Sequence, residues 1–362
     1  MVRVSDILRR MHEDGEKPPK RDDSPPRKEM EPKVQLLPPE KEAPVPFRKE
    51  IFPTTQLGAE DAEETYQRLL DFIIHSLVER VREGKAPAGA KEIEEAASSV
   101  VDRLQKGDTQ LLFLSGTRMT PDCYIYAHAA NCCILTCWIG MGFRYPREHL
   151  VQLAMASLVH DLGMEQVMDI VQKPSLLTSE ELAKVREHTR FTVETLRKIA
   201  GLPKLCVEIA ETIHERFNGK GYPAGRSGPD LSIESQCVAI CDVYEALTHP
   251  RAYREKLSPH MALKTILEIM KEFFNLNVLK VFMQQLTVFP AGSWVELSTG
   301  ERGQVIGIRT AYPLRPVVKI YFDVLNNKIA VPRTIDLSRH VPLYVKRSLE
   351  EKEMGGKLKG VS

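Results

Sequence analysis

The stretch LVHDLGM, residues 158–164, and the stretch HERFNGKGYP, residues 214–223, decide how this sequence is interpreted. The first ends a long apolar helical pattern with the adjacent residues His160 and Asp161. Imidazole and carboxylate groups are common metal ligands, and the two oxygens of one carboxylate can bridge two ions. The pair alone is a weak indication of a metal site, because most buried histidines are hydrogen-bonded core residues.

Further residues of ligand type lie on other segments with helical spacing. They are His128 within 124–141, His188 within 179–199, His214 at the end of 205–213, and Asp242 within 233–247. Helical bundles build di-metal sites by directing such side chains inward from several helices. The sequence therefore predicts one cluster, formed by His128, His160, Asp161, His188, His214 and Asp242, that can serve two ions.

These residues occur in an order that resembles the HD-GYP family of the HD phosphohydrolase superfamily. The motifs, over residues 124–259, are His128, His160-Asp161, His188, His214-Glu215, Gly221-Tyr222-Pro223, Asp242, Ala246-Leu247-Thr248, Arg251 and Tyr253-Arg254. The resemblance implies a mainly α fold, with an HD-type helical bundle. It also implies a phosphodiesterase that hydrolyses the bacterial second messenger cyclic di-GMP to pGpG or GMP.

The metal interpretation divides the ligands into two groups. His128, His160, Asp161 and Asp242 are expected to hold one ion, and His188 and His214 a second ion that shares the Asp161 carboxylate. Two such ions clamp a phosphodiester and lower the pKa of a bridging water. Mixed imidazole and carboxylate ligands favour Fe or Mn. Asp161 is the predicted catalytic residue because both ions depend on it.

Two other groups of residues complete the predicted site. The resemblance assigns the substrate phosphate to Arg251 and Arg254, and a guanidinium fork suits phosphate oxygens, although exposed surface arginines remain an alternative. A rigid loop beside the site is predicted for Gly219, Gly221, Tyr222 and Pro223. In the family this loop is linked to contacts with GGDEF-type cyclase domains.

The sequence also departs from the family pattern. Met164 stands where the family usually has Lys, Ile213 replaces the first residue of a His-His-Glu motif, and Tyr124 replaces a Glu that some members carry. Asn218 and Lys220 replace the usual Asp and Ser of the loop. A third metal is therefore not expected. A second hypothesis stays open, a catalytically weak regulator that binds cyclic di-GMP or a partner protein; a third is an HD hydrolase for another nucleotide.

The order of segments predicts several parts. These are a disordered, Pro- and charge-rich segment with a possible short docking helix (1–55), a helical region (56–115), the metal-dependent domain (116–288), a small antiparallel β subdomain (289–348) and a flexible tail (349–362). Helices are expected at 59–82 and 90–106, with a short one from 111 closed by Ser115-Gly116-Thr117. Strands are expected at 293–297, 303–308 and 317–322. A homodimer through the N-terminal helices is possible.

Composition limits the partners that we expect. The 362 residues carry a formal net charge of +1 with mixed signs, so neither nucleic acid nor a membrane is an expected partner. No leader or long apolar run is recognisable, which predicts a cytoplasmic protein. The seven cysteines lie in apolar helical patterns, and we expect buried, reduced thiols.

Overall fold

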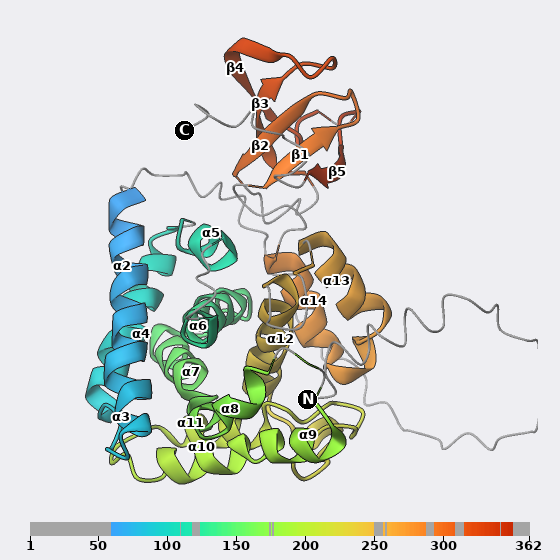
Figure 1. Cartoon of the computed structure of the whole chain (residues 1–362). Coiled ribbons are helices and arrows are strands. Elements are labelled where there is room, and N and C mark those ends of the chain that lie inside the picture. The colour runs from blue at the N-terminus through green and yellow to red at the C-terminus, as the bar shows by residue number, and fades with distance from the viewer. Residues whose placement is uncertain are drawn as a thin grey trace, which may run out of the picture. The chain divides into compact units, whose positions relative to one another are not determined.

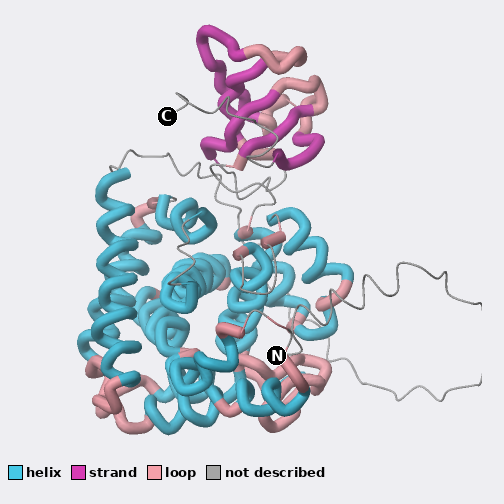
Figure 2. Tube along the Cα trace, in the orientation of Figure 1, coloured by secondary structure: helices cyan, strands magenta, loops and turns pink. Residues whose placement is uncertain are grey.

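The computed structural model describes residues 59–108, 110–117, 124–173, 175, 177–249, 256–257, 259–286, 293–307, 315–340 and 342–349. Within these residues a helical region is followed by a small antiparallel sheet (Figures 1 and 2). The mainly α fold predicted from the sequence is therefore confirmed. The predicted segment 1–55, residues 350–362 of the predicted tail and the two arginines Arg251 and Arg254 lie outside the described residues. The predicted start of the tail at residue 349 was wrong, because Leu349 is a buried residue of a strand.

Three helices form the centre of the helical region. They are α6 (Tyr124–Gly142), α7 (Arg147–Val159) and α12 (Ile233–Thr248), and α6 packs against both others. Every residue of α12 from Ser235 onward is buried, as expected of a helix that is largely apolar on all sides. Polar residues in these helices are consequently placed inside the bundle, where they need partners.

The N-terminal helices pack on this centre. A continuous helical stretch consists of α2 (Ala59–Asp71), the π-helical segment η1 (Phe72–Val78) and α3 (Glu79–Arg82). It is followed by α4 (Ala90–Gln105) and α5 (Gln110–Thr117), and α2 contacts α4, α5 and α6. The predicted break at residues 115–117 was wrong: these residues remain helical, and the Ser115 hydroxyl donates to the carbonyl oxygen of Leu112 at 2.8 Å.

The region between the central helices contains shorter elements. They are η3 (Leu162–Val167), α8 (Met168–Val171), α9 (Ser179–Arg186), α10 (His188–Leu196), α11 (Lys204–Thr212) and η4 (Gly228–Asp230). The single helix predicted over 179–199 is two helices that separate at Glu187. Thr178 begins α9 with a capping box, in which its hydroxyl accepts from the N–H of Glu181. After α12, the helical part of the chain ends with α13 (Pro259–Glu268), η5 (Lys271–Phe273) and α14 (Leu276–Gln285).

The sheet has five antiparallel strands in the order β4-β3-β2-β1-β5. The strands are β1 (Trp294–Leu297), β2 (Arg302–Gly307), β3 (Val317–Phe322), β4 (Lys328–Asp336) and β5 (Val345–Leu349). Trp294, Phe322 and Leu349 form a buried cluster. The sequence predicted the first three strands and missed the last two. Strand β4 is an edge strand with mostly exposed side chains, and an edge tolerates Pro332, which has no N–H to donate.

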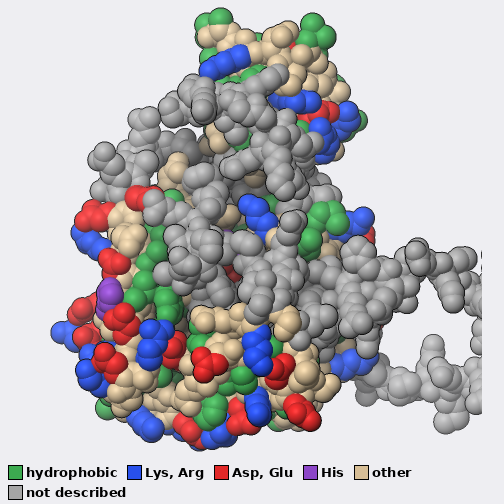
Figure 3. Space-filling model, in the orientation of Figure 1, with side chains coloured by type: hydrophobic (Ala, Val, Ile, Leu, Met, Phe, Trp, Pro, Cys, Tyr) green, Lys and Arg blue, Asp and Glu red, His purple; other side chains and the backbone are tan. Residues whose placement is uncertain are grey.

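Buried thiols and a mixed surface agree with the sequence. The six described cysteines, Cys132, Cys133, Cys137, Cys206, Cys237 and Cys241, are free and buried. On the face shown in Figure 3, acidic and basic side chains are interspersed over the helical region. None of the described helices combines the length and apolar character needed to cross a membrane.

Candidate metal centre

The predicted pair His160 and Asp161 lies where α7 ends. His160 keeps helical backbone angles as the C-cap of α7, whereas Asp161 leaves the helix and precedes η3. The Nδ1 of His160 lies 2.7 Å from the carbonyl oxygen of Ser157. Because Nδ1 donates to that carbonyl, Nε2 is left as a lone-pair donor, and it lies 3.5 Å from Oδ2 of Asp161.

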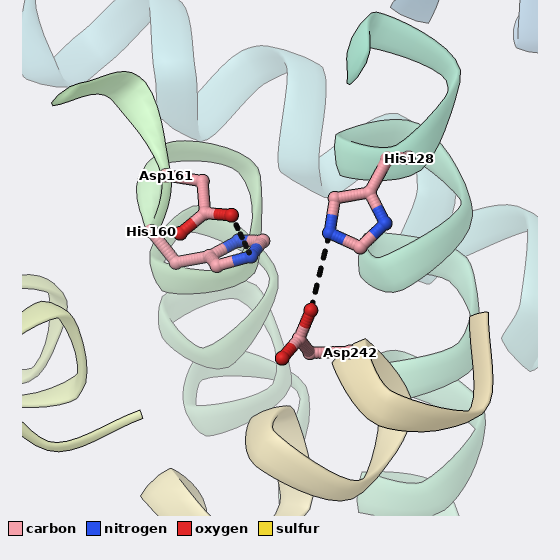
Figure 4. Close-up of side chains that lie close together, drawn as sticks. All are labelled: His128, His160, Asp161 and Asp242. Carbon is pink, nitrogen blue, oxygen red and sulfur yellow. Dashed lines mark ion pairs between the residues drawn. The ribbon is translucent and has the colours of Figure 1, made fainter. Parts of the chain in front are cut away.

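Two further residues approach this pair from other central helices. His128 extends from α6 and Asp242 from α12, and Figure 4 shows both side chains directed toward the space beside His160 and Asp161. The Nε2 of His128 lies 3.3 Å from Oδ1 of Asp242. One ligand-type atom from each of these four residues lies within 4.8 Å of the others, a spacing suited to one metal ion.

A second group shares Asp161. The Nε2 atoms of His188 and His214 lie 3.4 Å and 3.6 Å from Oδ1 of Asp161, and 2.8 Å from each other. The Nδ1 of His188 donates to the carbonyl oxygen of Val185 at 2.5 Å. Two neutral imidazole nitrogens that face each other repel unless a proton or a cation lies between their lone pairs. A metal ion bound by all three residues would remove that repulsion.

Unpaired buried atoms test whether these residues fit a metal. Among the described residues, no hydrogen-bond partner is found for Nε2 of His160, Oδ1 of Asp161 or either carboxylate oxygen of Asp242. Buried polar atoms are almost always hydrogen-bonded, so several orphaned acceptors in one place require another partner. All of these nitrogen and oxygen atoms carry lone pairs that divalent metal ions bind. The His/Asp cluster therefore fits a metal centre.

Electrostatics favours the ligand forms of several of these groups. Burial raises the pKa of Asp161, but His160, His188 and His214 lower it more, and the net pKa is well below its ordinary value. In Asp242 burial likewise raises the pKa, yet His128 and His214 lower it to about 2. Burial lowers the pKa of His214 to about 4. Both carboxylates are thus ionised and His214 is neutral at neutral pH, as metal binding requires.

His128 behaves differently without a cation. Burial lowers its pKa, but Cys132, Glu245 and Asp242 raise it more, so that the pKa lies well above its ordinary value. A proton on Nε2 occupies the position from which this nitrogen would bind a metal. Metal binding at His128 must therefore release that proton.

The predicted loop lies against the second group. The ring of Tyr222 stacks on the ring of His214, with centroids 4.9 Å apart and planes 17° apart. The Tyr222 N–H donates to the carbonyl oxygen of His214 at 3.2 Å. At Gly221 a Cβ would lie 2.4 Å from the backbone of Glu215 and Arg216, so only glycine fits. The loop therefore supports His214 from the side.

Gly163 brings the residues after the His-Asp pair against α10. A Cβ at this position would lie 2.2 Å from the carbonyl oxygen of His188 and 2.5 Å from the backbone nitrogen of Thr192. The Gly163 N–H donates to the Thr192 hydroxyl at 2.9 Å. The close approach, which requires glycine, keeps Asp161 next to His188.

Sequence reasoning missed one residue beside the cluster. The Glu245 carboxylate, fully buried in α12, accepts from Nδ1 of His128. The missed signal was its position three residues after Asp242, which places both carboxylates on one face of the helix. Of the family departures, Ile213 is fully buried in the core and Met164 is half-buried. The side chain of Tyr124 lies outside the described residues.

Comparisons with known proteins agree with this geometry. Residues 138–275 match the family model described as "HD domain", and residues 294–357 match a "KOW domain associated with HD domain". A cyclic di-GMP phosphodiesterase of Pseudomonas aeruginosa is 30% identical over 222 residues, which are 61% of this chain and 53% of the relative. A 3'3'-cGAMP-specific phosphodiesterase of Vibrio cholerae is 31% identical over 150 residues, 41% of this chain and 34% of the relative.

The chain thus spans about half, or less, of the length of these curated relatives. A solved HDG"Y"P protein from Bdellovibrio bacteriovorus has the same fold, with a TM-score of 0.52 and 15% identity over 64% of this chain and 73% of that one. The predicted HD-type bundle is therefore confirmed. Residues 138–275 thus form an HD domain, and the ordered motifs of the chain resemble those of HD-GYP proteins.

Proposed function

We propose that this protein is a metal-dependent phosphodiesterase that hydrolyses cyclic di-GMP to pGpG, GMP or both. The observation that carries the proposal is the convergence of six ligand-type residues from five helices or helix ends, with Asp161 belonging to both groups. The similarity to a cyclic di-GMP phosphodiesterase of Pseudomonas aeruginosa supports the choice of substrate.

The proposed cofactor is a pair of divalent ions, with Fe or Mn favoured by the imidazole and carboxylate donors. His128, His160, Asp161 and Asp242 would hold one ion, and Asp161, His188 and His214 the other. When bound, such a pair polarises a phosphodiester and supplies an activated water at neutral pH.

The chain's own residues would hold this centre in a defined geometry. The carbonyl oxygens of Ser157 and Val185 accept from Nδ1 of His160 and His188, so both rings present Nε2 to the cluster. The Asp161 carboxylate presents one oxygen toward each group. Burial of the histidines excludes bulk water and strengthens their charge interactions. Arg251 and Arg254 stay predicted phosphate contacts.

One experiment tests the substrate and the activity. The full chain, purified without chelators and loaded with Mn²⁺, is incubated with cyclic di-GMP and, in parallel, with 3'3'-cGAMP. Release of pGpG or GMP, lost with EDTA and restored by Mn²⁺, is the expected result. Faster hydrolysis of 3'3'-cGAMP than of cyclic di-GMP would instead assign 3'3'-cGAMP as the substrate, the specificity named for the relative from Vibrio cholerae.

The alternative function is a catalytically weak regulator that binds cyclic di-GMP or a protein partner. Met164 and Ile213 motivate it, because they remove a cation and an imidazole that the resemblance leads us to expect. Metal-loaded protein that binds cyclic di-GMP but releases no product would support this alternative. A GGDEF-type partner at the Gly-Tyr-Pro loop, a homodimer and a cytoplasmic location all stay predictions.

A further inference from the structure

A buried chain of side chains connects the N-terminal helix α2 to the metal ligand His128. The Tyr66 hydroxyl on α2 donates to Oδ1 of Asn131 on α6 at 2.7 Å. The amide Nδ2 of Asn131 donates to Oε1 of Glu245 on α12 at 3.1 Å. The other oxygen of Glu245 accepts from Nδ1 of His128. Tyr66 and Asn131 are 0% exposed and Glu245 is 1% exposed.

The chemistry of the chain permits one orientation of the Asn131 amide. If the amide were reversed, its carbonyl oxygen would face the Glu245 carboxylate, and the two acceptors would repel. With Oδ1 accepting from Tyr66, the amide N–H groups face Glu245 and help to hold this carboxylate. Oε1 of Glu245 also lies 3.1 Å from Nδ1 of His249. A buried carboxylate needs such donors, because burial without them is costly.

The carboxylate in turn orients His128. With Nδ1 donating to Glu245, the imidazole presents Nε2 to Asp242, 3.3 Å from Oδ1. A carboxylate that accepts from the second nitrogen of a metal-binding histidine fixes its ring and raises its basicity. His160 and His188 obtain the corresponding contact from a carbonyl three residues earlier in the chain. His128 obtains it from a side chain on another helix.

We propose that Tyr66 is a positioning residue for the metal centre, acting on His128 through Asn131 and Glu245. The proposal rests on the proposed metal function. It assigns the N-terminal helix α2, which precedes the HD-domain match at 138–275, a part in holding one ion. That ion is the one bound by His128, His160, Asp161 and Asp242. The ion at His188 and His214 should be insensitive to Tyr66.

The test is the substitution Tyr66→Phe in the full chain, with Mn²⁺ alone as the probe. Titration followed by electron paramagnetic resonance gives the affinities of the two ions. Loss of an outer partner of a metal ligand costs about 10- to 100-fold in affinity, and Tyr66 lies at the far end of the chain. We therefore expect one affinity to fall about tenfold and the other to stay within about twofold.

Tyr244→Phe is the matched control. Tyr244 is a buried tyrosine next to Glu245 in the sequence, and its ring packs edge-on against Phe282. The same hydroxyl is removed from the same helix bundle, so both Mn²⁺ affinities should stay unchanged. An equal fall of affinity in Tyr66→Phe and Tyr244→Phe would overturn the proposal, since it would reflect general loosening of the bundle.

A double-mutant cycle with Glu245→Gln separates positioning from simple stability. If both residues act through the same series of hydrogen bonds, the effects of Tyr66→Phe and Glu245→Gln on the affinity of the ion at His128 should be less than additive. In a His188→Ala background, Tyr66→Phe should still weaken the ion that remains. Additive effects with Glu245→Gln, or a lowered Tm with both affinities unchanged, would overturn the proposal.

The failure of this proposal is distinguishable from failure of the proposed function. If the wild-type protein binds two Mn²⁺ ions but does not hydrolyse cyclic di-GMP, the proposed enzymatic activity is rejected. The Mn²⁺ titration of Tyr66→Phe then still decides the role of Tyr66. If the wild-type protein hydrolyses cyclic di-GMP but Tyr66→Phe changes both Mn²⁺ affinities by less than twofold, the proposed activity stands and the role of Tyr66 is rejected.

Discussion

The two halves of the metal centre are held in different ways. His188 is oriented by a carbonyl oxygen three residues earlier in its own chain segment, and Gly163 and Tyr222 pack close by. His128 is oriented by Glu245, which is held through Asn131 by a tyrosine on α2. His188 thus depends on short-range structure, and His128 on contacts between helices far apart in the sequence. Substitutions at residues that support only one of these histidines should therefore affect the two halves separately.

Asp161→Ala should have the largest effect, because Asp161 belongs to both halves. The substitution removes one ligand from each ion and an anion that screens the two cations from each other. We expect turnover and the occupancy of both ions to be lost together. Metal analysis and cyclic di-GMP hydrolysis are the measurements. Two ions per chain in Asp161→Ala would show that the carboxylate does not join the halves.

His188→Ala is the companion variant for that experiment. It removes a ligand from one half and leaves His128, His160, Asp161 and Asp242 in place. One Mn²⁺ ion should remain bound with near-normal affinity. Loss of both ions to the same extent as in Asp161→Ala would contradict two separately supported halves.

Gly163→Ala should have an intermediate effect, confined to the half that contains His188. The added Cβ meets the His188 carbonyl oxygen at 2.2 Å, and backbone cannot give way as a flexible side chain can. Overpacking of this kind costs about 1–3 kcal/mol. We expect urea unfolding to show a loss in that range, with a weaker ion at His188.

The control for this substitution is Gly116→Ala. Gly116 lies on helix α5, and among the residues that the structure describes, a Cβ added there would meet no neighbouring side chain or distant backbone within 4 Å. Alanine in a helix costs less backbone entropy than glycine, so the free energy of unfolding should stay level or rise by up to about 1 kcal/mol. A comparable loss in both variants would show that close approach at Gly163 is not the cause.

Arg147→Met should have the smallest effect and sharpens the role of the N-terminal helices. The Arg147 guanidinium on α7 donates to both carboxylate oxygens of Asp102 on α4, at 2.6 Å and 3.0 Å, in a half-exposed pair. Such pairs contribute about 0–1 kcal/mol. If α2 acts through Tyr66, weakening this other contact should leave both Mn²⁺ affinities unchanged.

The same pair has a defined pH dependence. The hydrogen bond from Arg147 lowers the pKa of Asp102 below its ordinary value despite an opposing effect of burial. Its contribution to folding is present above the unfolded pKa of about 3.9 and is lost as the pH falls through the lower folded pKa. The difference in unfolding free energy between wild type and Arg147→Met should therefore disappear in strong acid. A difference that persists there would point to lost packing instead.

Neighbouring residues in the sequence were the easiest to place in the cluster. His160 and Asp161 are adjacent, and Tyr222 belongs to a motif only eight residues after His214, so local order suffices to associate each pair. The six predicted ligand positions all lie in the cluster. Their assignment to ions stays a prediction, since donor atoms alone do not identify the bound metal.

Sequence reasoning missed the contacts that support His128 from outside the ligand cluster. Asn131 and Glu245 are separated by 114 positions, and no local pattern pairs an amide with a carboxylate at that distance. The break at Glu187 also escaped, because the apolar spacing continues across it. Strand β4 was missed because an exposed edge strand lacks the buried alternation by which strands are recognised.

The π-helical segment η1 determines which residues of the N-terminal stretch face the bundle. The sixteen residue steps from Tyr66 to Arg82 would, in a regular α-helix, turn the chain through four full circles and about 160° more, leaving the two residues on opposite sides. Bonds that span five residues turn the chain more slowly than bonds that span four, so the seven residues of η1 reduce that rotation. Tyr66 consequently reaches Asn131, while Arg82 reaches Glu165 and Tyr126. The segment thus sets the angle about the helix axis between Tyr66 and Arg82. A regular α-helix in its place would turn one of these two residues toward solvent.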